Sequence, residues 1–182
     1  MRAAALALAL LVAPALAEGQ GRLSRGGSDT DGRFEAPLSL GVRLGGLVAY
    51  GSPAGSPSGV GGGVYGLFDL QSVLADVSAD VWGGDKAAQI AGGLGVYWPV
   101  LGSANTTPYL GGGAQLAYVR FGGEGAFGLQ LRTAVGLLAS RRWSPHIRLE
   151  LAWLFDTMSE RERYLDRRHL SNGPLATIGL GF

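Results

Sequence analysis

The residues best suited to chemistry lie near the end of the chain, in the stretch RHLSNG. His169 and Ser171 stand two positions apart there, so on an extended strand both side chains share one face. A serine hydroxyl beside a histidine can carry out acyl transfer when a carboxylate orients the imidazole. No Asp or Glu follows Ser171, so that carboxylate must come from an upstream residue such as Asp166 or Asp156. The alternative is a loop end in which neither residue is catalytic.

Metal and cofactor chemistry is not indicated. The chain has two histidines and no cysteine, and no second ligand stands near His146, so any metal site would depend on carboxylates. The runs GVGGGVYG and GGG lie inside strand-like patterns with no helical pattern after them, which argues against a phosphate-binding loop. We therefore predict no metal and no cofactor.

The chain begins with a segment typical of exported proteins, and the elements that would position His169 and Ser171 come after it. Residues 1–17 carry one charge at Arg2, an apolar run and the ending Ala-Leu-Ala, which predicts a secretory signal peptide; the alternative is a retained anchor. Residues 18–36 are polar and Gly-rich, which predicts a flexible N-terminal segment. Without residues 1–17 the chain has 14 basic and 14 acidic residues, so its net charge is zero and nucleic acid is not a predicted partner.

Glycine is the most unusual feature of the composition, with 32 residues, about 18% of the chain against a usual share near 7%. Helices do not tolerate this content, because each interior Gly costs about 1 kcal/mol relative to Ala. At the same time 47% of the residues are apolar and regularly spaced, which excludes a disordered chain. The composition therefore favours strands.

Eight segments after the N-terminal part have apolar residues at every second position, separated by turn-like clusters, which predicts β-strands. In the third segment, Val77 and Ala79 alternate with Ser78 and Asp80. In the fifth segment the alternation is blurred, and we predict a Gly-assisted bulge near residues 111–113. The predicted strands span 37–51, 60–70, 72–84, 87–100, 108–121, 127–139, 146–155 and 175–182.

The polar faces of these strands decide between a soluble barrel and a membrane barrel. Only 16% of the chain is charged, whereas a soluble surface needs about a quarter or more. An apolar exterior around a crowded polar lumen predicts an all-β fold, an eight-stranded antiparallel up-and-down transmembrane β-barrel over residues 37–182. Its lumen charges must neutralise one another, the alternative being an ion or solute path. These charges are Arg43, Asp76, Asp80, Arg132, Arg148 and Glu150.

Aromatic residues near the strand ends are predicted to lie at the two membrane interfaces, whereas a soluble barrel would bury them in its core. Trp82 shares the face of Asp80 by strict alternation, so either it closes the mouth of the lumen or the strand bulges before it. The predicted interfacial aromatics are Tyr50, Trp98, Tyr109, Trp143 and Phe182.

With its signal-like start, eight alternating segments, absence of cysteine and ending IGLGF, the chain resembles the small outer-membrane β-barrels of Gram-negative bacteria, of the outer-membrane protein A and X types. In that family a final aromatic with apolar residues at every second position before it is read by the barrel-assembly machinery. The resemblance implies this role for Ile178, Leu180 and Phe182. It also implies a place in the outer membrane among its lipids and lipopolysaccharide, and we predict a monomer.

An even-stranded barrel with both termini in the periplasm places the odd-numbered connections outside, at residues 51–58, 83–85, 122–125 and 157–172. The last is the longest and most charged. Its simplest interpretation is a solvated loop near charge balance. The alternative is a binding site for lipopolysaccharide phosphates or for a surface partner.

Three functions follow. The first is a non-enzymatic outer-membrane barrel with a structural or surface-interaction role and a lumen plugged by paired charges. The second rests on RHLSNG, which is similar to the His-x-Ser-Asn stretch of outer-membrane lipid A deacylases and implies an acyl hydrolase using His169 and Ser171. The third is a narrow channel lined by charges such as Asp80 and Arg132.

Overall fold

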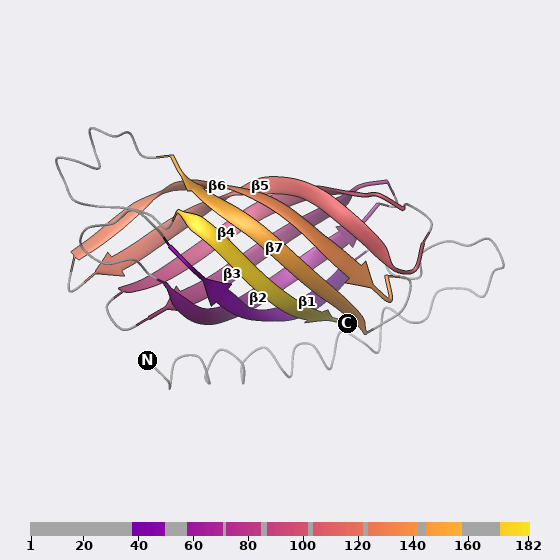
Figure 1. Ribbon diagram of the computed structural model, residues 1–182, viewed down its shortest axis with the longest axis horizontal. Helices are drawn as coiled ribbons and strands as arrows, with labels where there is room; N and C mark the ends of the chain where they lie inside the picture. The colour runs from indigo at the N-terminus through magenta and orange to yellow at the C-terminus, as the bar shows by residue number, and fades with distance from the viewer. Residues whose placement is uncertain are drawn as a thin grey trace.

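The computed structural model describes residues 38–49, 58–70, 72–84, 87–101, 104–121, 124–141, 145–157 and 172–182. They form eight strands, each antiparallel to the next in the chain, and the last pairs with the first (Figure 1). The predicted all-β, eight-stranded antiparallel barrel is confirmed. The strands are β1 (Leu38–Leu47), β2 (Gly59–Asp69), β3 (Leu74–Gly83), β4 (Ala87–Pro99), β5 (Thr107–Phe121), β6 (Glu124–Ala139), β7 (His146–Asp156) and β8 (Gly173–Gly181).

The two chain-end strands close the barrel. β8 pairs with β7 on one side and with β1 on the other, from Gly41 opposite Gly181 to Leu47 opposite Leu175. Beyond that ladder Leu40 and Phe182 exchange two backbone hydrogen bonds, of 3.1 and 2.8 Å. Closure removes the unpaired strand edges that an open sheet would expose.

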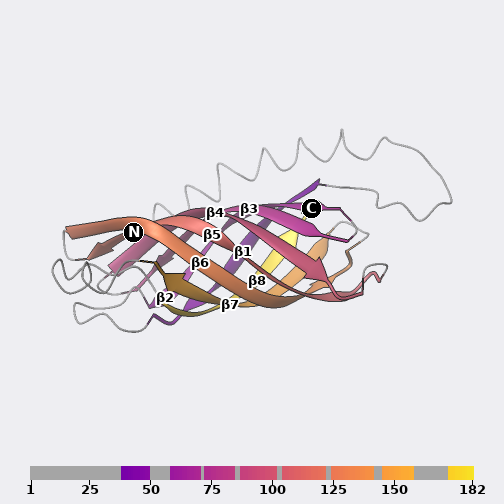
Figure 2. The same cartoon turned by 90° about the horizontal axis from the view of Figure 1, so that it is seen from above.

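The two ends of the barrel carry different connections. The distal end carries the connections β1–β2, β3–β4, β5–β6 and β7–β8, and the proximal end carries the other connections and the C-terminus. The strands cross the long axis obliquely, as barrel closure requires (Figures 1 and 2). The β5–β6 hairpin is the longest, with strands of 15 and 16 residues.

Two local predictions about these strands are wrong. The predicted bulge at residues 111–113 does not occur, because β5 pairs without interruption with both β4 and β6. The alternation is blurred there because Tyr109 and Val119 point inward among outward apolar residues. The predicted connection over 122–125 is shorter, because Gly125 is still paired with Arg120.

Large apolar side chains cover the outside of the barrel. In the described part of the chain, no helix is long and apolar enough to cross a membrane. Most of the charged and amide side chains that the structure places are buried instead, so the alternation along the strands puts most apolar residues outside and most polar residues inside. Exposed apolar residues include Leu44, Val60, Ile90, Leu94, Phe127, Val135, Leu151 and Ile178.

Candidate functional site

The candidate site is the charged interior of the barrel. The structure buries all six residues predicted as lumen charges, together with a further pair, Asp69 and Arg141. Among the described residues that are fully buried, the interior therefore holds four arginines and four carboxylates, and each of these carboxylates is ion-paired with an arginine. Buried charges are tolerated when they are paired and hydrogen-bonded in this way.

Arg148 on β7 is the centre of the largest network. Its Nη1 donates to Asp76 Oδ2 at 2.7 Å and its Nη2 to Glu150 Oε2 at 2.6 Å. Its Nε donates to the Tyr109 hydroxyl at 2.9 Å, and that hydroxyl donates to Glu150 Oε2 at 2.9 Å. Arg132 Nη2 pairs with the other oxygen of Glu150. The Arg148 guanidinium thus joins three strands, β3, β5 and β7, because its planar fork presents donors in fixed directions, and Glu150 extends the network to Arg132 on β6.

Three tyrosine rings surround the Arg148 guanidinium. Its Cζ lies 5.4, 4.9 and 5.3 Å from the ring centroids of Tyr65, Tyr97 and Tyr109. These distances are within the range of a cation–π attraction. The rings come from β2, β4 and β5, so the cage exists only in the closed barrel.

Two further ion pairs flank this network. Arg43 on β1 binds both oxygens of Asp80 on β3, through Nε at 2.7 Å and through Nη2. At the proximal end Arg141 binds both oxygens of Asp69, at 2.5 and 2.6 Å. Sequence analysis missed this second pair: alternation does place Asp69 on the inner face of β2, but Arg141 lies outside every strand and 72 positions away.

Three glutamines form a neutral cluster on the distal side of Arg132. The side-chain amides of Gln89 and Gln115 both donate to Gln130 Oε1, at 3.0 and 2.9 Å. Each glutamine comes from a different strand, β4, β5 and β6. These residues were also missed as a cluster, because no spacing in the chain shows that they meet.

Glycine makes room for this interior. Many of the large inward side chains stand directly opposite a glycine of a neighbouring strand. A narrow barrel needs this alternation of large and small residues to fit its contents. The pairs are Tyr65 with Gly41, Arg43 and Asp80 with Gly63, Trp82 with Gly61, Asp76 with Gly95, Tyr97 with Gly111, Gln115 with Gly93, Arg132 with Gly113, Arg148 with Gly179 and His146 with Gly181.

A Gly136→Ala substitution is expected to lower the free energy of unfolding by about 1–3 kcal/mol, a typical loss for overpacking. A Cβ on Gly136 would collide with the Tyr109 ring and with the Leu149 carbonyl oxygen, and so push Tyr109 out of the network. Gly92→Ala is the matched control, because Gly92 faces outward and its nearest atom would be the Ser78 carbonyl oxygen at 3.7 Å. Urea unfolding in detergent measures both, and equal losses would contradict the packing argument.

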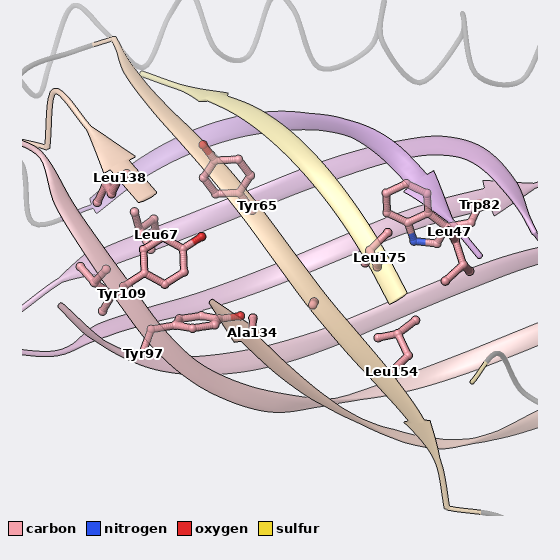
Figure 3. Packing of buried hydrophobic residues seen from close by; sticks show 12 residues of the cluster. Leu47, Tyr65, Leu67, Trp82, Tyr97, Tyr109, Ala134, Leu138, Leu154 and Leu175 are labelled. Atoms are coloured by element: carbon pink, nitrogen blue, oxygen red, sulfur yellow. The ribbon is translucent and has the colours of Figure 1, made fainter. Parts of the chain in front are cut away.

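Buried apolar side chains form two layers along the barrel, one toward each end (Figure 3). Trp82, at the distal end, is buried inside the barrel, and β3 pairs through it without a bulge. Of the two predicted alternatives, Trp82 therefore closes the mouth of the lumen. It belongs to one buried hydrophobic cluster with the residues of both layers. The distal layer contains Leu47, Trp82, Leu154 and Leu175, and the proximal layer contains Leu67, Leu74, Tyr97, Tyr109 and Leu138.

The aromatic positions differ in part from the prediction. Tyr109 is not interfacial: it is 2% exposed and points inward, because its hydroxyl satisfies Arg148 and Glu150. Trp98 does face outward near the proximal end, Phe182 is partly exposed, and Tyr50 and Trp143 lie outside the described residues. The sequence analysis missed four outward aromatics near the distal end, which the alternation of their strands could have indicated. They are Tyr118, Phe127, Trp153 and Phe155.

The proposed catalytic residues cannot be assembled from the described residues. His169, Ser171 and Asp166 lie outside them, as do the predicted signal peptide and N-terminal segment (1–36) and residues 158–171 of the last predicted outer connection. Asp156 ends β7 and is half-buried. In the ranges that the structure covers, no three of His, Cys, Asp and Glu are grouped to hold a metal ion.

Comparisons with known proteins show the fold. The barrel is similar to the crystal structure of Neisserial surface protein A, with a TM-score of 0.60 and 12% identity over 80% of this chain and 95% of that one. The chain has the fold of the small outer-membrane β-barrels. Another match is the N-terminal β-barrel domain of Pseudomonas aeruginosa OprF, with a TM-score of 0.48 and 15% identity over 79% of this chain and 96% of that one. The Yersinia pestis outer membrane protein Ail also matches, with a TM-score of 0.43 and 10% identity over 79% of this chain and 97% of that one. No family model and no curated protein sequence matches.

Proposed function

We propose that this protein is an integral outer-membrane β-barrel with a structural or surface-interaction role and no catalytic activity. The observation that carries the proposal is the inside-out distribution of side chains: apolar residues outside, paired charges within. A closed barrel also satisfies its backbone hydrogen bonds internally, as hydrocarbon requires. On this proposal the surroundings are outer-membrane lipids and lipopolysaccharide, and the barrel-assembly machinery reads the terminal strand.

The lumen is closed in this proposal. An ion crossing it would have to pass an apolar layer, break ion pairs that already neutralise one another, and pass a second apolar layer. The hollow bordered by Ser78, Gly93, Gln115 and Arg132 has no room for a water molecule. A barrel of eight strands is just wide enough for its own side chains to fill it.

Gel mobility of the mature chain refolded in detergent tests the membrane barrel. A sample loaded without boiling is expected to migrate differently from a boiled one, because the closed ladder of backbone hydrogen bonds resists detergent until it is heated. The same mobility in both lanes, together with a folded protein that stays soluble in plain buffer, would contradict the proposal.

Planar bilayer recordings test the closed lumen. We expect no discrete conductance steps from the inserted barrel. Discrete steps whose size changes in an Arg132→Gln variant would instead show that the charged interior conducts, and the channel function would replace the plugged one.

A further inference from the structure

Arg120 differs from the other charged residues whose side chains the structure places. The side chain of Arg120 on β5 is exposed on the outer face, which it shares with Leu116 and Tyr118. The remaining charged side chains with a described position are buried in the barrel or, for Asp156, half-buried on the inward side of β7. An arginine on a membrane-facing surface is costly at the bilayer midplane and tolerated near the interface, where water and lipid headgroups surround its charge.

Arg120 lies at the distal rim of the apolar surface. It is two residues beyond Tyr118, which pairs with Phe127 of β6, and both rings belong to the outward aromatic group at this end. Aromatic side chains in such positions mark the level of the lipid headgroups. On the proposed function, Arg120 therefore stands at the headgroup level of the outer leaflet.

The Tyr118 hydroxyl is directed to the same place. Arg120 is paired across the sheet with Gly125 and, on its other side, with Ala88. A Cβ on Gly125 would collide with the ring and hydroxyl of Tyr118, so the ring leans toward the distal end and its hydroxyl lies beside Gly125. The Tyr118 ring and hydroxyl thus lie where a side chain on Gly125 would be, on the outward face beside Arg120, so a phenol hydroxyl and an arginine side chain are neighbours there.

We propose that Arg120 and the Tyr118 hydroxyl bind a phosphate group of an outer-leaflet lipid headgroup, a site that rests on the proposed membrane function. The arginine fork matches two phosphate oxygens, and the tyrosine hydroxyl donates to a third. On the other side of Arg120, Ala88 contributes only a methyl group beside the site. The aromatic rings below hold the site at the headgroup level.

Lipid titration followed by native mass spectrometry tests the site on the full mature chain in detergent micelles. The probes are lipid A with its phosphates, the same lipid with its phosphates removed, and phosphatidylglycerol. We expect phosphorylated lipid A to bind more tightly than the dephosphorylated form. Arg120→Gln is expected to weaken that binding roughly 10- to 100-fold, as for the loss of hydrogen bonds to a charged group. Tyr118→Phe, which removes one hydroxyl and keeps the ring, is expected to weaken it about 2- to 10-fold.

Two variants separate the site from general effects on the barrel. Arg120→Lys keeps the charge without the fork and is expected to restore part of the affinity that Arg120→Gln loses. Trp98→Phe changes an outward aromatic at the proximal end and is expected to leave the affinity unchanged. If phosphorylated lipid A binds more tightly than phosphatidylglycerol, the bound phosphate belongs to lipid A. If these two lipids bind equally and Arg120→Gln weakens both, the site accepts the phosphate of any lipid.

The outcomes distinguish this site from the proposed function. A barrel that shifts on boiling but binds phosphorylated and dephosphorylated lipid A equally, or is unaffected by Arg120→Gln, overturns the phosphate site and leaves the membrane barrel standing. A chain that shows no boiling-dependent shift overturns both.

Discussion

An Arg148→Met variant is expected to lose about 3–5 kcal/mol of unfolding free energy, the usual loss when one partner of a buried ion pair is removed. Methionine keeps much of the volume but none of the donors. Asp76 loses its hydrogen-bonded arginine, Glu150 loses one of two, and the Tyr109 hydroxyl loses its donor. Urea unfolding in detergent, followed by the fraction of protein that keeps the mobility of the unboiled form, measures the loss.

The matched control removes both members of a neighbouring pair. In an Arg43→Met/Asp80→Leu double variant no buried charge is left without a partner, so the loss of unfolding free energy is expected to be much smaller than for Arg148→Met. Equal losses for the two proteins would show that volume, and not uncompensated charge, sets the stability of the interior. An unchanged Arg148→Met protein would show that its carboxylate partners are hydrated.

The second large effect is expected on the outside. Leu151 is 62% exposed in the middle of β7, between Val135 and Ala176 of the neighbouring strands. In a bilayer a Leu151→Arg substitution is expected to lower the free energy of unfolding by about 2–4 kcal/mol, the range for an arginine on the lipid face near the midplane. The measurement is urea unfolding from phosphatidylcholine vesicles.

The same substitution separates a membrane barrel from a soluble one. On a water-exposed surface, Leu151→Arg would change the free energy of unfolding by no more than about 0.5 kcal/mol. Leu151→Met, which stays apolar, is the control and is expected to be nearly neutral in either setting. A neutral Leu151→Arg variant in vesicles would place this face in water and contradict the membrane assignment.

Alternation along the chain is enough to predict the strands and most of their faces. Successive side chains of a strand point to opposite sides, so each apolar or polar residue is assigned a side by counting alone. This is why Arg43, Asp76 and Arg148 could be placed inside before any pairing was known. Eight strands occupy most of residues 37–182, so the sequence predicted a single barrel domain there.

Alternation fails where both faces of a strand are apolar. Tyr109 was assigned to the membrane interface because it is aromatic and near a strand end, yet it points inward to bind Arg148 and Glu150. The Gly111 to Gly113 run was interpreted as a bulge, whereas its inward glycines stand opposite Tyr97 and Arg132 in a regular ladder. In both cases the reason lies on another strand.

The local sequence therefore determines strand positions and the inside-out character of the barrel, because these depend on a period of two. It does not determine which inward residues meet, because that depends on the register between strands and on closure of β1 with β8. Three contacts join residues from different strands or turns: the pair Asp69–Arg141, the three rings around Arg148, and the Tyr118 hydroxyl beside Gly125. Closing the chain into a barrel brings these groups together.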